Sequence, residues 1–156
     1  MVSHGKYIGN GWKYIVDLLS KLDVLLSNKK QDLLLEIDPF LIDKVLANTI
    51  SFPSETLLFI IDSFKEKVFE EMNENSGFFY EETRMFSLLK IVEIADANID
   101  RVRIIWTLLW QKLTELFSEI AGHSNKKIGF FVVDSLKRLA MKFLQVNFIR
   151  KINNLI

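Results

Sequence analysis

Residues 98–122 read NIDRVRIIWTLLWQKLTELFSEIAG, residues 123–127 read HSNKK, and residues 128–144 read IGFFVVDSLKRLAMKFL. Apolar residues recur every three or four positions in both long segments, which is the spacing of one buried face of an α-helix. The stripes are Val102, Ile105, Trp106, Leu109, Leu113, Leu116, Phe117 and Ile120, then Ile128, Val132, Leu136, Leu139, Ala140 and Phe143. Two helices joined by so short a polar connection lie antiparallel. The stretch therefore predicts a helical hairpin, the unit of helical-repeat scaffolds.

The composition of the whole chain favours the same class of fold. A chain of 156 residues can bury a sizeable core, and a hydrophobic content of 49% with thirteen Phe and three Trp excludes a disordered chain. Two Pro and six Gly leave little turn chemistry for an all-β fold. We therefore expect residues 1–156 to form one all-α domain, a HEAT-like or armadillo-like helical-repeat (α-solenoid) fragment.

Helix-start signals divide the rest of the chain. Asp38 followed by Pro39, and Ser54 after Pro53, are typical of the first residues of helices. Asp100 is expected to cap the first helix of the hairpin. The helices expected before the hairpin cover residues 10–26, 39–48, 54–72 and 84–97.

The segments between these helices are less regular. Residues 27–32 are polar and predict a loop, whereas residues 33–37 are apolar but too short to assign to a helix or a strand. Residues 73–82 predict the main internal loop, and their aromatic run FFY is expected to cover an edge of the core. The residues expected to be buried in the short helix 39–48 are Phe40, Val45 and Leu46.

The formal net charge is zero, but the charges are unevenly distributed. Residues 1–35 carry five basic and three acidic groups, residues 36–96 carry five and thirteen, and residues 97–156 carry ten and four, giving +2, −8 and +6. A basic C-terminal third favours an anionic membrane or an acidic partner surface. The alternative is that these charges are the solvated faces of two ordinary helices.

Five basic residues are the candidates for a contact with a membrane or a small GTPase. They are Lys126, Lys127, Lys137, Arg138 and Lys142, which cluster along the outer side expected for the last long helix. Zero net charge and the lack of a recognisable module argue against nucleic-acid binding.

The residue types needed for catalysis are scarce. The chain has no Cys, and His4 and His123 are its only imidazoles, neither in a metal-ligand spacing. Ser124 adjoins His123, and adjacent residues in a short turn cannot set a nucleophile against a base. The sequence therefore predicts no enzyme, no metal site and no cofactor. The first residues do not resemble a signal peptide, and no apolar run approaches the roughly 20 residues that span a bilayer.

Two further sets of residues have both a structural and a functional interpretation. Trp106 and Trp110 are four apart and belong either to the core or to a binding platform. Asp134 lies in an apolar run, where a buried carboxylate would need a partner. It forms either a structural clamp or a contact with a partner protein. The same two interpretations apply to Arg101 and Arg103.

Several motifs together resemble those of one family. They are Arg101-Val102-Arg103, Trp106, Trp110, Asn125, Val133-Asp134-Ser135-Leu136 and Met141-Lys142-Phe143-Leu144, with Tyr7-Ile8-Gly9-Asn10-Gly11-Trp12 and Ile42-Asp43-Lys44-Val45 further upstream. On these motifs the chain resembles the first conserved region downstream of the catalytic domain in the large, brefeldin A-inhibited Arf guanine-nucleotide exchange factors, the Sec-seven/BIG group. The resemblance is strong over residues 84–144 and weak over residues 26–75.

This resemblance implies a regulatory scaffold excised from a much larger protein. In the family, the region is associated with activated, membrane-bound Arf-type GTPase and with neighbouring domains of the parent protein. The implied localisation is cytoplasmic, peripheral on trans-Golgi network membranes, in vesicle-mediated transport. The alternatives are a purely structural spacer, or a fragment of the related large scaffold that lacks the exchange domain.

The sequence also departs from the family at the hinge between the two long helices. The segment Ala121-Gly122-His123-Ser124-Asn125 replaces the usual Gly-Cys-Asn-Pro-Asn, and Lys126-Lys127 replace an acidic pair. Asp100 stands where Asn is usual, and Gly11 where Ser is usual. The reversed charge at the hinge affects any partner contact that the resemblance implies there.

Overall fold

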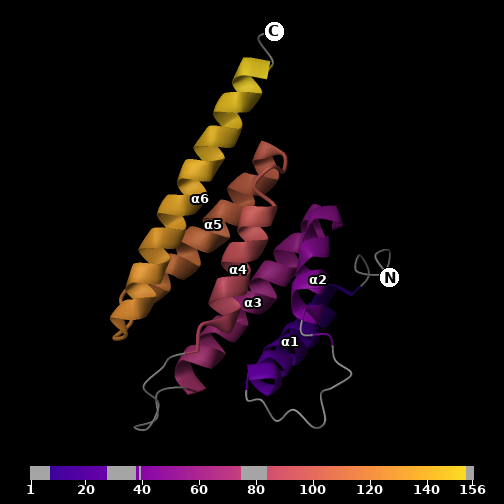
Figure 1. Cartoon of the computed structure of the whole chain (residues 1–156), viewed down its shortest axis with the longest axis vertical. Coiled ribbons are helices and arrows are strands. Elements are labelled where there is room, and N and C mark those ends of the chain that lie inside the picture. Colours follow the sequence, from indigo (N-terminus) through magenta and orange to yellow (C-terminus); the bar gives the residue numbers. More distant parts are fainter. Residues whose placement is uncertain (1–7, 28–37, 39, 75–83, 154–156) are drawn as a thin grey trace. The chain divides into compact units, whose positions relative to one another are not determined.

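A computed structural model describes residues 8–27, 38, 40–74 and 84–153 of the chain (Figure 1). The described residues form six α-helices and no β-strand, so the predicted all-α class is confirmed. The chain divides into two compact units, Met1–Ile94 and Ala95–Ile156. The predicted repeat character of the fold stays a prediction.

Helix α1 (Trp12–Ser27) follows a 3-10 turn (Gly9–Gly11) and agrees with the helix predicted over residues 10–26. Gly9 has φ of +45°, a left-handed conformation that glycine adopts without steric cost. Helix α1 packs against α3 (Ser54–Glu74) and buries Trp12, Val16 and Leu19. These contacts form one side of the core of the first unit.

Helix α2 (Leu41–Ala47) continues into a 3-10 turn (Asn48–Ser51) and is shorter than predicted. The Asp38 carboxylate accepts a hydrogen bond from the Phe40 N–H (2.9 Å) and pairs with Lys44, so Asp38 does stabilise the start of this segment. The predicted burial of Phe40 is wrong, because Phe40 precedes the first turn and is 64% exposed. The predicted burial of Leu46 is confirmed, and Ile42, four residues earlier on the same face, is buried with it.

Helices α3 and α4 (Phe86–Ala97) complete the first unit, and α4 extends three residues into the second. Both match the predicted helices within two residues. The core residues of α3 recur with helical spacing: Leu57, Ile60, Ile61, Phe64, Val68 and Met72. The predicted loops over residues 27–32 and 73–82, and the short segment 33–37, lie almost wholly outside the described residues.

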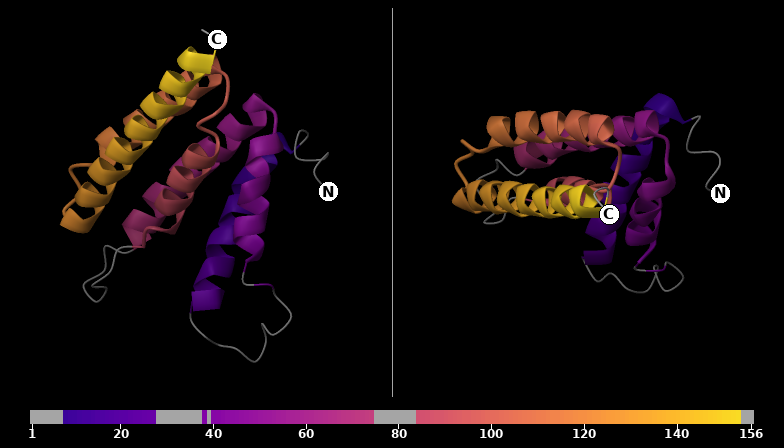
Figure 2. Two further views of the ribbon diagram at one scale, coloured as in Figure 1. Left: turned by 45° about the horizontal axis from the view of Figure 1, so that its top comes forward. Right: turned by 90° about the horizontal axis from the view of Figure 1, so that it is seen from above.

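The second unit contains the helical hairpin that the opening stretch predicts. Helices α5 (Arg103–Ile120) and α6 (Lys126–Asn153) lie side by side, joined by a short turn (Figures 1 and 2). Their apolar stripes meet: Trp106, Leu109, Leu113 and Ile120 of α5 are buried, as are Ile128, Val132 and Leu139 of α6. The predicted pairing of the two segments is therefore confirmed.

The predicted cap of α5 is wrong. The residue before the helix is Val102, which makes no side-chain capping hydrogen bond, and Asp100 lies in the preceding turn. The turn leaves Ile99 buried, so the chain reaches the helix two residues later than the capping rule predicts. The Asp100 carbonyl accepts a hydrogen bond from Arg150 of α6, which ties this turn to the end of the hairpin.

Candidate functional site

The predicted basic surface lies on α6. Lys126, Lys127, Lys137 and Arg138 are all exposed. Lys137 and Arg138 follow Lys126 and Lys127 by eleven residues each, which is three helical turns plus about 20°. The two pairs therefore share one face of α6 and lie about 16 Å apart along the helix axis. Lys142 behaves differently, as its ammonium group bonds to the Asp96 carboxylate (2.7 Å) and carbonyl (3.3 Å). Of the five predicted cations, Lys142 is thus the one that the structure ties to α4.

The same face of α6 carries large apolar side chains that the sequence analysis did not single out. Phe130 is 76% exposed, and four more of these side chains are also exposed: Val133, Met141, Leu144 and Phe148. They occupy the positions between the basic residues, because α6 is apolar on two sides and only one side packs on α5. A second apolar stripe, offset from the first, was the signal that could have revealed them.

The hinge sets the electrostatics of the basic face. The Asn125 N–H donates to His123 Nδ1 (3.1 Å), and the Lys127 N–H donates to Asn125 Oδ1 (3.0 Å), so Asn125 caps α6. Lys126 and Lys127 are therefore in the first turn of the helix. There the positive end of the helix dipole adds to the charge of the two lysines. This like charge destabilises the first turn of α6, but it strengthens the attraction of that turn for anions.

Three of the remaining predicted residues have clear positions. Asp134 is exposed on α6, so its carboxylate stays hydrated and the expected need for a buried partner does not arise. Ser135 is buried, and its hydroxyl has no hydrogen-bond partner among the described residues. Arg101 is half-buried and donates from Nε to Asn98 Oδ1 (2.7 Å), while burial lowers the pKa of its guanidinium. This hydrogen bond lies within the turn before α5, and both interpretations of Arg101 stay predictions.

The two tryptophans have different surroundings. Trp106 is 2% exposed and stacks on Phe143, with ring centroids 5.3 Å apart. Trp110 is half-buried, and its ring centroid lies 5.9 Å from that of Trp106. It lines a groove of about 320 Å³ between α5 and α6. Trp106 is therefore a core residue, whereas Trp110 contacts the core on one side and lines the groove on the other.

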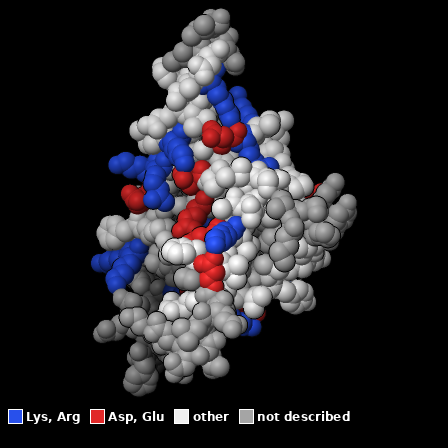
Figure 3. Space-filling model, turned by 45° about the vertical axis from the view of Figure 1, so that its right-hand side comes forward, with Lys and Arg blue, Asp and Glu red and all other residues white. Residues whose placement is uncertain are grey.

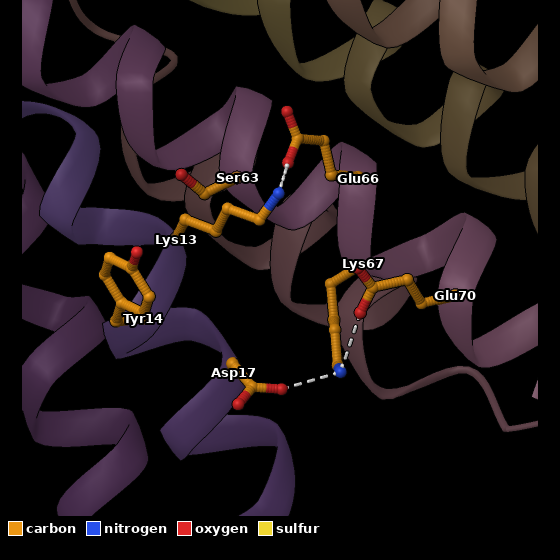
Figure 4. A pocket seen from close by; sticks show the side chains of 7 residues that line it. All are labelled: Lys13, Tyr14, Asp17, Ser63, Glu66, Lys67 and Glu70. Atoms are coloured by element: carbon orange, nitrogen blue, oxygen red, sulfur yellow. Dashed lines mark hydrogen bonds and ion pairs between the residues drawn. The ribbon is translucent and has the colours of Figure 1, made fainter.

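A cleft of about 170 Å³ in the first unit lies between α1 and α3 and is lined by charged side chains (Figure 4). Lys13 pairs with Glu66 (2.9 Å), and Lys67 pairs with Asp17 (2.8 Å) and Glu70 (2.9 Å). Burial lowers the pKa of Lys67, but its hydrogen bonds to the two carboxylates outweigh burial and raise it. Since these two lysines are engaged by carboxylates, the cleft is a junction between helices rather than an anion site.

A second polar cluster in the first unit was missed by the sequence analysis. Glu71 of α3 is 1% exposed and accepts hydrogen bonds from the Ser20 hydroxyl of α1 (2.9 Å) and from the Ser87 N–H and hydroxyl of α4 (3.0 and 2.8 Å). Arg84 approaches it to 3.4 Å and also bonds to Ser20 and Asp23. Glu71 lies three residues after Val68 on the buried stripe of α3, and this helical spacing could have revealed it.

Basic and acidic side chains adjoin on the face drawn in Figure 3. In the described part of the chain, no three His, Cys, Asp or Glu residues are grouped so as to hold a metal ion. None of the helices in that part combines the length and the hydrophobicity that crossing a membrane requires.

Fold and surface together define a class: an all-helical module whose last helix exposes basic and apolar side chains. Brefeldin A-inhibited guanine nucleotide-exchange protein 1 of Arabidopsis thaliana is 31% identical over 114 residues, which is 73% of this chain and 6% of that protein. The ADP-ribosylation factor guanine nucleotide-exchange factor SEC7 of Saccharomyces cerevisiae is 44% identical over 63 residues, 40% of this chain and 3% of that protein. Brefeldin A-inhibited guanine nucleotide-exchange protein 1 of Rattus norvegicus is 44% identical over 62 residues, with the same two shares.

The chain is homologous to a short part of these guanine nucleotide-exchange proteins. It spans about 6% of the length of the first Arabidopsis relative. No protein-family model and no solved structure matches it.

Proposed function

We propose that this chain is a non-catalytic regulatory scaffold of a large exchange factor for ADP-ribosylation factor (Arf). The observation that carries the proposal is the homology, which covers 73% of this chain but only 6% of an exchange protein. The scaffold controls recruitment and activity of the exchange factor at trans-Golgi network membranes. It does so by engaging activated Arf-type GTPase and the anionic membrane surface.

The exposed face of α6 supports the membrane part of this proposal. Lys126, Lys127, Lys137 and Arg138 lie on one side of the helix, interleaved with exposed apolar side chains. Helices that lie in the headgroup region of a membrane have this combination of basic and apolar residues. Each basic group near an anionic membrane contributes about 1 kcal/mol.

The second candidate function is a structural spacer that joins helical repeats within a large protein. The first unit favours it, because its lysines Lys13, Lys67 and Lys90 are all paired with carboxylates of the same unit. A spacer would bind neither GTPase nor membrane.

Flotation of the chain with vesicles distinguishes the two functions. The vesicles are neutral or contain anionic lipid, and carry Arf-type GTPase loaded with GTP or with GDP. The regulatory scaffold floats with anionic vesicles and more so when the GTPase is GTP-loaded. Flotation that depends on neither the lipid charge nor the nucleotide would support the spacer.

A charge-reversal variant locates the surface. Replacing Lys137 and Arg138 by Glu removes about 2 kcal/mol of attraction, so we expect membrane partitioning to fall at least about tenfold. The control replaces Lys21 and Lys44 by Glu, which changes the net charge equally at exposed positions of the first unit. Equal losses in both variants would show that net charge, not this face of α6, directs binding.

A further inference from the structure

A groove lies between α5 and α6 in the second unit. Its floor and walls are aromatic and apolar, and one polar and one charged residue stand on the side of α5. The residues lining it are Arg103, Trp106, Thr107, Trp110, Ala140, Phe143 and Leu144. At about 320 Å³ it lies in the size range of sites that bind a ligand or a partner side chain.

Arg103 distinguishes this groove from an ordinary gap in helix packing. The other cations near this end of the hairpin are engaged: Arg101 by Asn98, Lys142 by Asp96 and Arg150 by Asp100. The guanidinium of Arg103 is exposed and has no partner among the described residues. It presents a planar set of donors that matches a carboxylate in a bidentate arrangement.

The dimensions restrict the occupant. Arg103 and Trp110 are seven residues apart, about two helical turns or 10 Å along α5. That length receives one or two large apolar side chains, with a carboxylate close to one of them. Trp and Arg are also the residues that dominate binding energy at protein interfaces, where anchor side chains fill recessed pockets.

We propose that this groove is the docking site for the activated GTPase, receiving an apolar anchor of the GTPase on Trp106, Trp110 and Phe143 while a neighbouring carboxylate of the GTPase pairs with Arg103. This inference rests on the proposed function and names the contact through which the GTPase is engaged. The basic face of α6 then serves the membrane, and the groove serves the protein partner.

The test is done in solution, without lipid. Isothermal titration calorimetry measures binding of the chain to a soluble Arf-type GTPase loaded with a non-hydrolysable GTP analogue or with GDP. One variant, Thr107→Trp, fills the groove from an exposed position, and another, Arg103→Glu, reverses its charge. We expect the wild type to bind the GTP form and each variant to bind at least about tenfold more weakly.

Two controls match these variants. Ser118→Trp adds the same bulk on the same side of α5, about 16 Å further along and outside the groove. Lys151→Glu makes the same charge change at an exposed position near the end of α6. Both controls are expected to bind the GTPase within about twofold of the wild-type affinity, which is a negligible change in binding free energy. Circular dichroism checks that all four variants keep their helix content.

The outcomes separate this inference from the proposed function. If the wild type binds the GTP form in solution and both groove variants bind equally well, the groove proposal is overturned and the proposed function stands. If the wild type binds no GTPase in solution and none on vesicles, the proposed function itself fails. Loss of self-association in Thr107→Trp would identify a second copy as the occupant, and loss of vesicle binding without GTPase would identify a lipid chain. Either result would overturn the proposal.

Discussion

The two compact units use their charged residues in opposite ways. In the first unit Glu71 is buried and hydrogen-bonded to two other helices, α1 and α4, and Lys67, only 11% exposed, is held by two carboxylates. In the second unit no charged residue is buried among the described ones, and most of the basic residues of α6 face solvent. Buried charge therefore belongs to the fold of the first unit, whereas the second unit presents most of the basic residues of α6 at its surface.

The largest effect is expected where the second unit depends on apolar packing. Trp106→Ala removes a side chain that is 2% exposed and stacked on Phe143. We expect it to lower the free energy of unfolding by about 4 kcal/mol, measured by urea denaturation followed by circular dichroism. The control Ile104→Ala changes an exposed neighbour and should cost less than about 0.5 kcal/mol. Similar losses in both variants would contradict the assignment of Trp106 to the core.

The next largest effect tests the buried charge of the first unit. Glu71→Ala leaves the Ser20 and Ser87 donors without their acceptor and Arg84 without its buried carboxylate. We expect a loss of about 3 kcal/mol, because buried groups left without a partner are costly. Glu55→Ala, at an exposed position in the first turn of α3, should cost only about 0.5 kcal/mol. A cost for Glu71→Ala no greater than that of Glu55→Ala would remove the contrast between the units.

The same comparison shows what the sequence could predict. Helical periodicity and helix-start signals located all six α-helices of the described residues, two of them as the α5–α6 hairpin, because an apolar stripe at helical spacing must be buried. Two local predictions were wrong: Phe40 is exposed while Ile42 is buried, and Val102, not Asp100, is the residue before α5, where Ile99 is buried. Local propensity sets where a helix can begin, and tertiary packing decides where it does.

The candidate site was predictable only in part. The basic residues of α6 were visible as charges, and their common face followed from their spacing. The tie of Lys142 to Asp96 of α4, the exposed state of Asp134 and the free guanidinium of Arg103 depend on which residues meet when the helices of the second unit pack together. A single sequence does not specify that register, so these features came from the structure.

A smaller effect on stability is expected from replacing one buried serine in each unit. Ser87 of α4 donates from its hydroxyl to Glu71 (2.8 Å), whereas the buried hydroxyl of Ser135 has no partner among the described residues. Ser87→Ala should therefore cost about 1 to 2 kcal/mol, while Ser135→Ala should leave the stability unchanged or raise it by up to about 1 kcal/mol. Thermal unfolding of the two variants measures the change in stability and its sign for each. Destabilisation of equal size in both would show that the Ser135 hydroxyl is satisfied in solution.

The smallest effect concerns the ion pairs of the charged cleft. Hydrogen bonds from Lys21 and Lys67 hold the pKa of Asp17 below its ordinary value of 3.8. A carboxyl with a lowered pKa in the folded state contributes stability above pH 3.8, and this contribution is lost as the pH falls through the lowered value. The Asp17 side chain is 36% exposed, so solvent screening limits the contribution to a few tenths of a kcal/mol.

Asp17→Asn should therefore be less stable than the wild type by about 0.5 kcal/mol at pH 6, and the difference should shrink as the pH is lowered towards 2. Urea unfolding at several pH values measures it. The second unit supplies the control, Asp134→Asn, which removes an exposed carboxylate without breaking an ion pair to any described residue. A difference for Asp17→Asn that is as large at pH 2 as at pH 6 would mean that the loss arises from packing. The charges of the cleft would then not be what joins α1 to α3.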